Sequence, residues 1–455
     1  MEKKEIIDQP ESLLQAINRK LRNSLLVKLC FCGIILLVCQ IPMLMVSELT
    51  GHRERLAVSV ECEVASKWGF TQSIKGPLMA IPISKELSEK NKDGSVRNYT
   101  ARSMLFVVPD SLKVIAYLEP EIRYRGIYEV MLYRSQVLLE GYFAETPSIP
   151  TDWTPELDKA RLYIGISAMI GLSNIQVEVD CSDNKVRPGI DAPNAPFNSG
   201  MTISVALPEK GALPDGGLHF KASFALNGCR NFSAVPLGKT TTMEISSSWN
   251  SPSFDGNFLP VKREVGTKGF QASWEINEFN RNIPPSWNGM DRTNDGEFPV
   301  AGVSLMKPAN IYSQVTRAVT YSILIFLIVL MAFLIAESVT KTWMHPLQYF
   351  LAALSLVLFY ALTLALSEHL AFVLSYWLAA AAITGLCVFY CALIFREKPA
   401  VIGMGLAVLA SYAVIFVLLR LEDYALLAGT LVMFVLLAIL MGMTGRMNQK
   451  GKEEN

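Results

Sequence analysis

Six long apolar stretches dominate the pattern of this chain. The first runs from about Leu25 to Val46, and five others follow near the C-terminus, at Val319–Ala336, Leu347–Leu366, Phe372–Phe395, Val401–Leu419 and Tyr424–Met443. A helix rises about 1.5 Å per residue, so about 20 apolar residues cross the hydrocarbon layer and satisfy their own backbone hydrogen bonds. The pattern predicts a membrane protein with six transmembrane α-helices, one N-terminal and five C-terminal. A large domain is inserted between helices 1 and 2.

The hydrophobic period changes within the inserted domain. Leu56, Val60, Val64 and Trp68 recur every four residues, which predicts one apolar stripe on a juxtamembrane helix. Apolar and polar residues then alternate at 175–179 and 218–226, as they do in half-buried strands. The segment 186–200 is rich in Pro, Asn and Gly and is the best loop or internal boundary. We therefore expect a mostly antiparallel β domain, for example a sandwich.

Basic residues predict the orientation in the membrane. The segments predicted to lie inside carry several Lys and Arg residues, whereas the short outer hairpins carry only Arg420. Because this bias in short loops sets orientation, we expect both termini in the cytoplasm and the large domain in the periplasm. The first stretch lacks a small-x-small cleavage site and is expected to stay as an anchor.

These patterns divide the chain into five parts. They are a cytoplasmic N-terminal segment (1–24), a transmembrane anchor (25–46), a periplasmic β-rich domain (47–317), a five-helix transmembrane bundle (318–444) and a cytoplasmic tail (445–455). The formal net charge is zero, and no basic stripe alternates with aromatic residues, so no nucleic-acid partner is indicated. We expect contact with membrane lipids and a periplasmic or envelope partner protein, and the oligomeric state stays open.

Four stretches, in this order along the chain, carry a family resemblance. They are Arg123–Val130; Ser251–Pro260 with Gly269–Trp274 and Asn280–Arg281; His345–Tyr349 with Leu366–His369; and Leu421–Leu427. Together they resemble the CreD family of bacterial inner-membrane proteins. The resemblance implies a role in cell-envelope integrity or stress response, linked to a two-component system and β-lactam tolerance, and it supplies no reaction. Where family members tend to read Gly-Ile-Ser-Asp-x-Arg-Gly, this chain has Ala168 and Ile170 in place of the Asp and Arg.

Charged residues gather in two of the predicted outer hairpins. Glu368 and His369 join the third and fourth spans, and Arg420, Glu422 and Asp423 join the fifth and sixth. A histidine near two carboxylates can act as a proton relay or pH sensor, and ionisable groups near hydrocarbon are usually paired or functional. The alternative is that short hairpins need polar residues to reach water, with Arg420 snorkelling to the interface.

A second candidate surface lies in the β domain. Arg123 and Arg125 share one face of a predicted strand, and with Tyr128 they can present a surface to an anionic ligand. A solvated strand face is the alternative. Trp249, Trp274 and Trp287 are predicted to be packing residues, with a sugar or lipid groove as the alternative.

Cysteine and histidine spacings indicate no metal site. Cys62, Cys181 and Cys229 fall in the exported domain, where three cysteines allow at most one bridge. Cys387 and Cys391 share a helix face, for which apolar packing is the simpler explanation. We find no zinc-ligand spacing, P-loop, HExxH, nucleophile elbow or dinucleotide fingerprint. We expect no cofactor and no enzyme, although triads assembled in space leave no linear trace.

Three functions follow from these features. The first, which we favour, is a non-enzymatic envelope protein whose β-rich domain binds a periplasmic component. The second is a transporter component, for which the spans offer few polar groups beyond Thr363, Thr384 and Ser411. The third is a membrane-bound enzyme that acts on envelope lipid or glycan through the charged hairpins.

Overall fold

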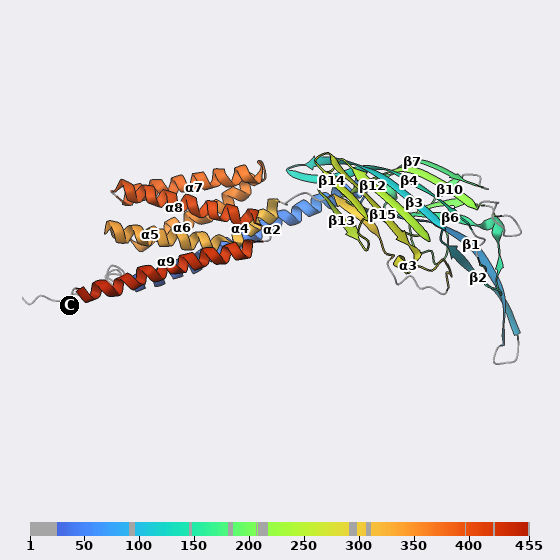
Figure 1. Cartoon of the computed structure of the whole chain (residues 1–455), viewed down its shortest axis with the longest axis horizontal. Helices are drawn as coiled ribbons and strands as arrows, with labels where there is room; N and C mark the ends of the chain where they lie inside the picture. Colours follow the sequence, from blue (N-terminus) through green and yellow to red (C-terminus); the bar gives the residue numbers. More distant parts are fainter. Residues whose placement is uncertain are drawn as a thin grey trace, which may run out of the picture. The chain divides into compact units, whose positions relative to one another are not determined.

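The computed structural model describes residues 25–90, 96–144, 148–180, 185–205, 207, 217–290, 298–305, 311–395, 397–421 and 424–453. The chain divides into two compact units, shown in Figure 1. Unit 1 comprises Met1–Leu56 and Ala309–Asn455, and unit 2 comprises Ala57–Pro308. The predicted cytoplasmic segment 1–24 lies outside the described residues.

Unit 1 is helical. Its helices are α2 (Leu25–Trp68, up to Leu56), α4 (Ile311–Thr320), α5 (Ser322–Thr340), α6 (Pro346–Ser367), α7 (Phe372–Ile394), α8 (Lys398–Arg420) and α9 (Ala425–Glu453). Among the described residues, five helices are long and apolar enough to cross a membrane, namely α2, α5, α6, α7 and α8. The sixth predicted stretch lies in α9, which contributes a shorter apolar segment, Leu427–Ile439. The predicted fold class, apolar helices at both ends of the chain around a β domain, is confirmed.

One face of α2 packs into the bundle. Its buried residues recur at helical spacing: Cys32, Ile35, Cys39, Met43 and Val46. The opposite face exposes large apolar side chains, as expected of a helix surrounded by lipid. Within the C-terminal helices, α6 packs against α7, α7 against α8, and α5 against α8.

Unit 2 is built from two β-sheets. Its strands are β1 (Gln72–Lys90), β2 (Val96–Val107), β3 (Ser111–Arg125), β4 (Tyr128–Phe143), β5 (Thr154–Pro155), β6 (Arg161–Ile166), β7 (Leu172–Val179), β8 (Val186–Pro188), β9 (Gly200–Ser204), β10 (Leu218–Cys229), β11 (Asn231–Val235), β12 (Thr240–Ser247), β13 (Pro252–Gly256), β14 (Lys262–Gly266), β15 (Gly269–Asn277), β16 (Ser286–Asn288) and β17 (Ala301–Leu305). Short helices are η1 (Leu157–Lys159), η2 (Met169–Gly171) and α3 (Glu278–Arg281).

Most strand pairs are antiparallel, as predicted. One sheet has the order β13-β17-β11-β1-β6-β9-β8, with β2, β16 and β5 beside this path, and the other has the order β14-β15-β12-β3-β4-β10-β7. In the described part of the chain, only β1 with β11 and β12 with β3 pair in parallel. Buried side chains of both sheets form one hydrophobic core, so the two sheets make a sandwich.

The predicted alternation is confirmed along β10 and fails once in β7. Leu218, Phe220 and the alternate residues up to Leu226 are buried, as are Val177 and Val179. Ile175 is 41% exposed. The register between β7 and β10 shifts between Gln176 and Ser173, and a bulge of this kind changes the direction in which a side chain points. The 186–200 segment is not one loop: β8 lies at its start, Gly200 begins β9, and the loop between them buries Phe197.

The predicted juxtamembrane stripe lies in the last part of α2: Leu56 is in unit 1 and is 38% exposed, whereas the other three residues are in unit 2. Val60, Val64 and Trp68 pack against a small buried cluster that includes Val130 and Leu132 of β4. The helix ends at Trp68, and the next residue, Gly69, has a φ of 143° and approaches the Asn227 carbonyl so closely that no room is left for a side chain.

Candidate functional site

Unit 2 contains a cavity of about 680 Å³, which falls within the usual size range of small-molecule sites. Ser73 and Lys75 line it from β1, and they lie on one face of that strand because side chains alternate along a strand. Ser167, directly after β6, lines it beside them. The Ser167 hydroxyl accepts a hydrogen bond from the Ser73 backbone N–H at 2.8 Å and donates to the Thr71 carbonyl at 2.9 Å. These bonds hold the end of β6 against the start of β1.

The other wall of the cavity is less regular. Asn257 follows β13, and its side-chain oxygen accepts a hydrogen bond from the Val300 N–H at 2.9 Å. Ile283, Phe298 and Val300 supply apolar surface. The cavity therefore combines apolar contact area with a few polar groups, the usual composition of a ligand site.

Arg281 enters this wall from the last residue of α3. The short helix is capped by Asn277, whose side chain accepts a hydrogen bond from the Phe279 N–H at 3.1 Å. The Arg281 side chain is 2% exposed and donates from Nη1 to the Ile283 carbonyl at 3.0 Å. Burial lowers the pKa of the Arg281 guanidinium, with opposition from the negative charge of Glu278.

Sequence reasoning missed this cavity. Arg281 was noted in the sequence only as part of a family motif, and Lys75 was not predicted to be a site residue. The two cations are far apart in the sequence, and no local spacing links a strand residue to the end of a short helix. One local feature could have indicated the site: an arginine follows a capped helical turn between two apolar strands.

The structure places the predicted arginine surface against α2. Arg123 donates from Nε to Glu121 at 2.7 Å, and its guanidinium carbon lies 3.9 Å from the centre of the Trp68 ring. Arg125 forms an ion pair with Glu63 at 2.6 Å. Tyr128 is half-buried, opposite Arg125 in the hairpin register. The hydrogen bond from Arg123 holds the pKa of the Glu121 carboxyl below its usual value. These arginines therefore hold the end of the helix on the sheet.

The charged hairpins of unit 1 are only partly described. Glu368 caps the end of α6, and its Oε1 lies 3.4 Å from Nε of Arg53, a partner that the sequence did not suggest. His369 is exposed. Arg420 is also exposed, and its guanidinium lies 5.4 Å from the Phe416 ring of its own helix. In the described part of unit 1, no hydrogen bond or ion pair joins Arg420 to Glu368 or His369. The remaining members of the predicted cluster, Glu422 and Asp423, lie outside the described residues.

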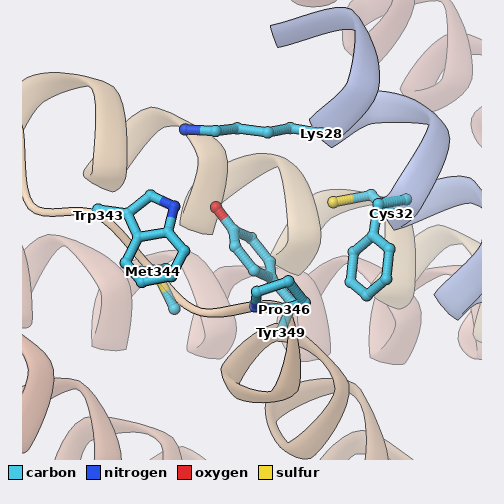
Figure 2. A pocket seen from close by; sticks show the side chains of 7 residues that line it. Lys28, Cys32, Trp343, Met344, Pro346 and Tyr349 are labelled. Carbon is cyan, nitrogen blue, oxygen red and sulfur yellow. The ribbon is translucent and has the colours of Figure 1, made fainter. Parts of the chain in front are cut away.

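A buried acid that the sequence analysis did not select organises the other end of the bundle. Glu337 of α5 is 5% exposed and accepts hydrogen bonds from Lys28 at 2.8 Å, the Met344 N–H at 3.1 Å and the Tyr349 hydroxyl at 2.5 Å. Figure 2 shows Lys28 and Tyr349 reaching toward a small cavity, with Trp343 beside them. This cavity, about 10 Å³, is near the minimum for one water molecule. The cluster ties α2, α5 and α6 together.

The family motif at 345–349 has a structural explanation. His345 is the N-cap of α6, and its Nδ1 accepts a hydrogen bond from the Leu347 N–H at 3.3 Å. Gln348 returns a hydrogen bond to the His345 N–H at 2.9 Å, which completes a capping box around Pro346 at the first helical turn. The cap fixes the start of the helix and so places the Tyr349 hydroxyl at Glu337.

The spans also bury more polar groups than the sequence analysis counted. Tyr360, Tyr376 and Tyr412 are all almost fully buried in α6, α7 and α8, around Phe359. The Tyr376 hydroxyl donates to the Tyr412 carbonyl at 2.8 Å. Aromatic packing of this kind gives the three helices a defined contact.

The remaining residue types offer few ligand groups. Within the described residues, no group of three His, Cys, Asp or Glu side chains is placed to hold a metal ion. Cys387 and Cys391 are buried, and Cys387 Sγ lies 3.4 Å from the Ser355 hydroxyl. Cys62 and Cys229 are free thiols, and Cys181 lies outside the described residues.

Trp274 is buried in the sandwich core, and its Nε1 donates to the Phe258 carbonyl at 3.1 Å, so its predicted packing role is confirmed.

Fold and sites together define a multi-pass membrane protein that carries a two-sheet β domain between its first and second apolar helices. The family model described as inner membrane protein CreD matches residues 24–450, and this chain belongs to the CreD family. Inner membrane protein CreD of Escherichia coli (strain K12) is 32% identical over an alignment of 422 residues that covers 90% of each chain. The resemblance seen in the sequence is thereby confirmed, and the chain is an inner-membrane protein.

One solved structure shows a weak likeness. It is a mutant M1 zinc metallopeptidase from Deinococcus radiodurans, 9% identical, with a TM-score of 0.21 over 43% of this chain and 42% of that one. At this level the likeness supports no conclusion about fold or activity.

Proposed function

We propose that this chain is a non-enzymatic inner-membrane protein that supports cell-envelope integrity or stress response by binding an envelope component in unit 2. The observation that carries the proposal is the cavity of about 680 Å³ in the β-sandwich. Its apolar wall and few polar groups suit a small molecule or the end of a larger chain. Family membership places the protein in the inner membrane, where such a component is accessible.

The orientation belongs to the same proposal. Basic residues occur before α2, between α5 and α6, between α7 and α8, and near the C-terminal end of α9, whereas the two outer connections, α6–α7 and α8–α9, have only Arg420, the last residue of α8. The positive-inside rule then assigns both termini to the cytoplasm and unit 2 to the periplasm. In this orientation the cavity faces periplasmic ligands.

The test fills the cavity and measures complementation. In a strain that lacks the protein, Lys75→Trp is expected to lose most of the growth advantage under detergent or β-lactam stress, because the indole occupies the ligand space. Lys262→Trp is the matched control, since Lys262 is an exposed strand lysine of the same unit and does not line the cavity. Both variants are compared at equal membrane abundance. Full complementation by Lys75→Trp would show that the function does not depend on the cavity.

A further inference from the structure

The guanidinium of Arg281 is incompletely paired inside the cavity wall. Of its N–H groups, Nη1 donates to the Ile283 carbonyl at 3.0 Å. Nε and Nη2 are buried and have no hydrogen-bond partner in the described part of the chain. A buried charged donor without a partner costs free energy comparable to its lost hydrogen bonds. The two free groups form the side edge of the guanidinium, the edge that binds an oxyanion with two parallel hydrogen bonds.

Two further groups in the cavity point to the same chemistry. The hydroxyl of Ser73 is buried and also lacks a partner among the described residues. Lys75 adds a second cation to the lining. The described side chains that line the cavity include no carboxylate, so neither cation is neutralised from within the lining. Glu278 lies close enough to act on Arg281 electrostatically but is not one of the lining residues.

We infer that the cavity binds an organic anion, whose carboxylate or phosphate group sits on Nε and Nη2 of Arg281. The Ser73 hydroxyl donates to the same group, and Lys75 supplies a second positive charge. Ile283 and Phe298 contact the apolar remainder of the ligand. The inference rests on the proposed binding function and names the ligand class of that site. The cavity volume, about 680 Å³, is far larger than an inorganic ion needs, so the ligand is a molecule of several carbon atoms.

The test uses the full chain in lipid nanodiscs and three probes at matched concentration. The first is an N-acetylated tetrapeptide with a free C-terminal carboxylate, the second is the same peptide amidated, and the third is glycerol 3-phosphate. Binding is measured by titration calorimetry and by the rise in Tm. We expect at least one anionic probe to bind about tenfold or more tightly than the amidated peptide, because only an oxyanion accepts both hydrogen bonds. The preferred anion identifies a carboxylate or a phosphate source.

Variants separate the anion contact from general packing. Arg281→Gln is expected to abolish the preference for the anion, and Arg281→Lys to weaken it, because an ammonium group cannot present the two-donor edge. Arg187→Gln, an exposed arginine on β8 away from the cavity, is the matched control and should change nothing. Should Arg281→Gln fail to fold, Ser73→Ala decides, because the Ser73 hydroxyl has no partner to lose among the described residues. This change is expected to leave Tm unchanged while weakening anion binding.

The outcomes distinguish this inference from the proposed function. The anion assignment would be overturned if neither the free peptide nor glycerol 3-phosphate bound more tightly than the amidated peptide, or if anion affinity were unchanged in both Arg281→Gln and Ser73→Ala. If Lys75→Trp nevertheless loses complementation, the binding function stands with a neutral ligand. If no probe binds and Lys75→Trp complements fully, both fall together.

Discussion

Glu337 is the one acidic residue of α5, and its surroundings show what a buried charge requires. Its carboxylate receives hydrogen bonds from an ammonium group, a phenol and a backbone N–H, so both oxygens are paired. Arg281 shows the opposite case, because Nε and Nη2 of its buried guanidinium have no hydrogen-bond partner among the residues that the structure describes. Buried charges are costly unless they are paired. We therefore assign Glu337 to the stability of unit 1 and Arg281 to ligand binding.

The residue scale gives a prediction about the Glu337 pair. Glu337→Gln keeps one acceptor oxygen and replaces the other with an NH2 donor, so either the Met344 N–H or the Tyr349 hydroxyl loses its acceptor, and Lys28 is left without its counter-charge. It is expected to destabilise the protein by about 3 kcal/mol, the lower end for breaking a buried pair, because Lys28 keeps some access to solvent. Adding Lys28→Met should recover most of the loss, since no charge is then left unpaired. The measurement is thermal unfolding in detergent, with exposed Glu48→Gln of α2 as the control. If the losses of stability caused by Glu337→Gln and Lys28→Met simply add in the double variant, the two side chains do not stabilise each other as a pair.

At the scale of elements, the end of α2 and the β3–β4 hairpin stabilise each other. The helix contributes Trp68 and Glu63, and the hairpin contributes Arg123 and Arg125 on one strand face. Glu121 accepts from Arg123 and also pairs with Arg134 at 3.2 Å. The sequence could show that the two arginines share a face, with a ligand surface or a solvated strand face as the alternatives, but it could not show that they contact a helix.

This contact predicts a pH dependence. The pKa of Glu121 is lower in the folded chain than in the unfolded one, so its contribution is present above the unfolded value, about 4.3, and is lost as the pH falls through the folded pKa. We expect Glu121→Gln to lower Tm at pH 7 and the difference from wild type to shrink as the pH falls below about 4. The effect is small, because Glu121 is partly exposed. Glu119→Gln on the same strand is the control, and a difference that does not change with pH would contradict the assignment.

At the scale of the whole molecule, sidedness is the property on which the function depends. The proposed binding role requires unit 2 to face the periplasm. Unit 2 carries two described thiols with different access: Cys62 is exposed, and Cys229 is buried. Burial, reinforced by the negative charge of Glu61, raises the pKa of Cys229 to about 12. These two thiols provide an internal pair of probes.

Thiol labelling checks the orientation. In a Cys181→Ser background, a membrane-impermeant maleimide added to intact spheroplasts is expected to label Cys62. Cys229 should stay unlabelled until the protein is denatured, because it is buried and its thiol is protonated at neutral pH. The Cys62→Ser, Cys181→Ser double variant is the control and should give no signal before denaturation. Labelling of Cys62 only after the membrane is permeabilised would place unit 2 in the cytoplasm.

The sequence by itself determined the apolar helices, the β character of the inserted domain and the family, because these depend on local periodicity and on contiguous motifs. It missed the Ile175 bulge, since a register shift depends on the neighbouring strand. Only the tertiary structure decided which charges meet. Lys28 and Glu337 are 309 positions apart, and Lys75 reaches the cavity of Arg281 from another element. Pairing between distant polar groups depends on how elements pack, and no periodicity within one element encodes it.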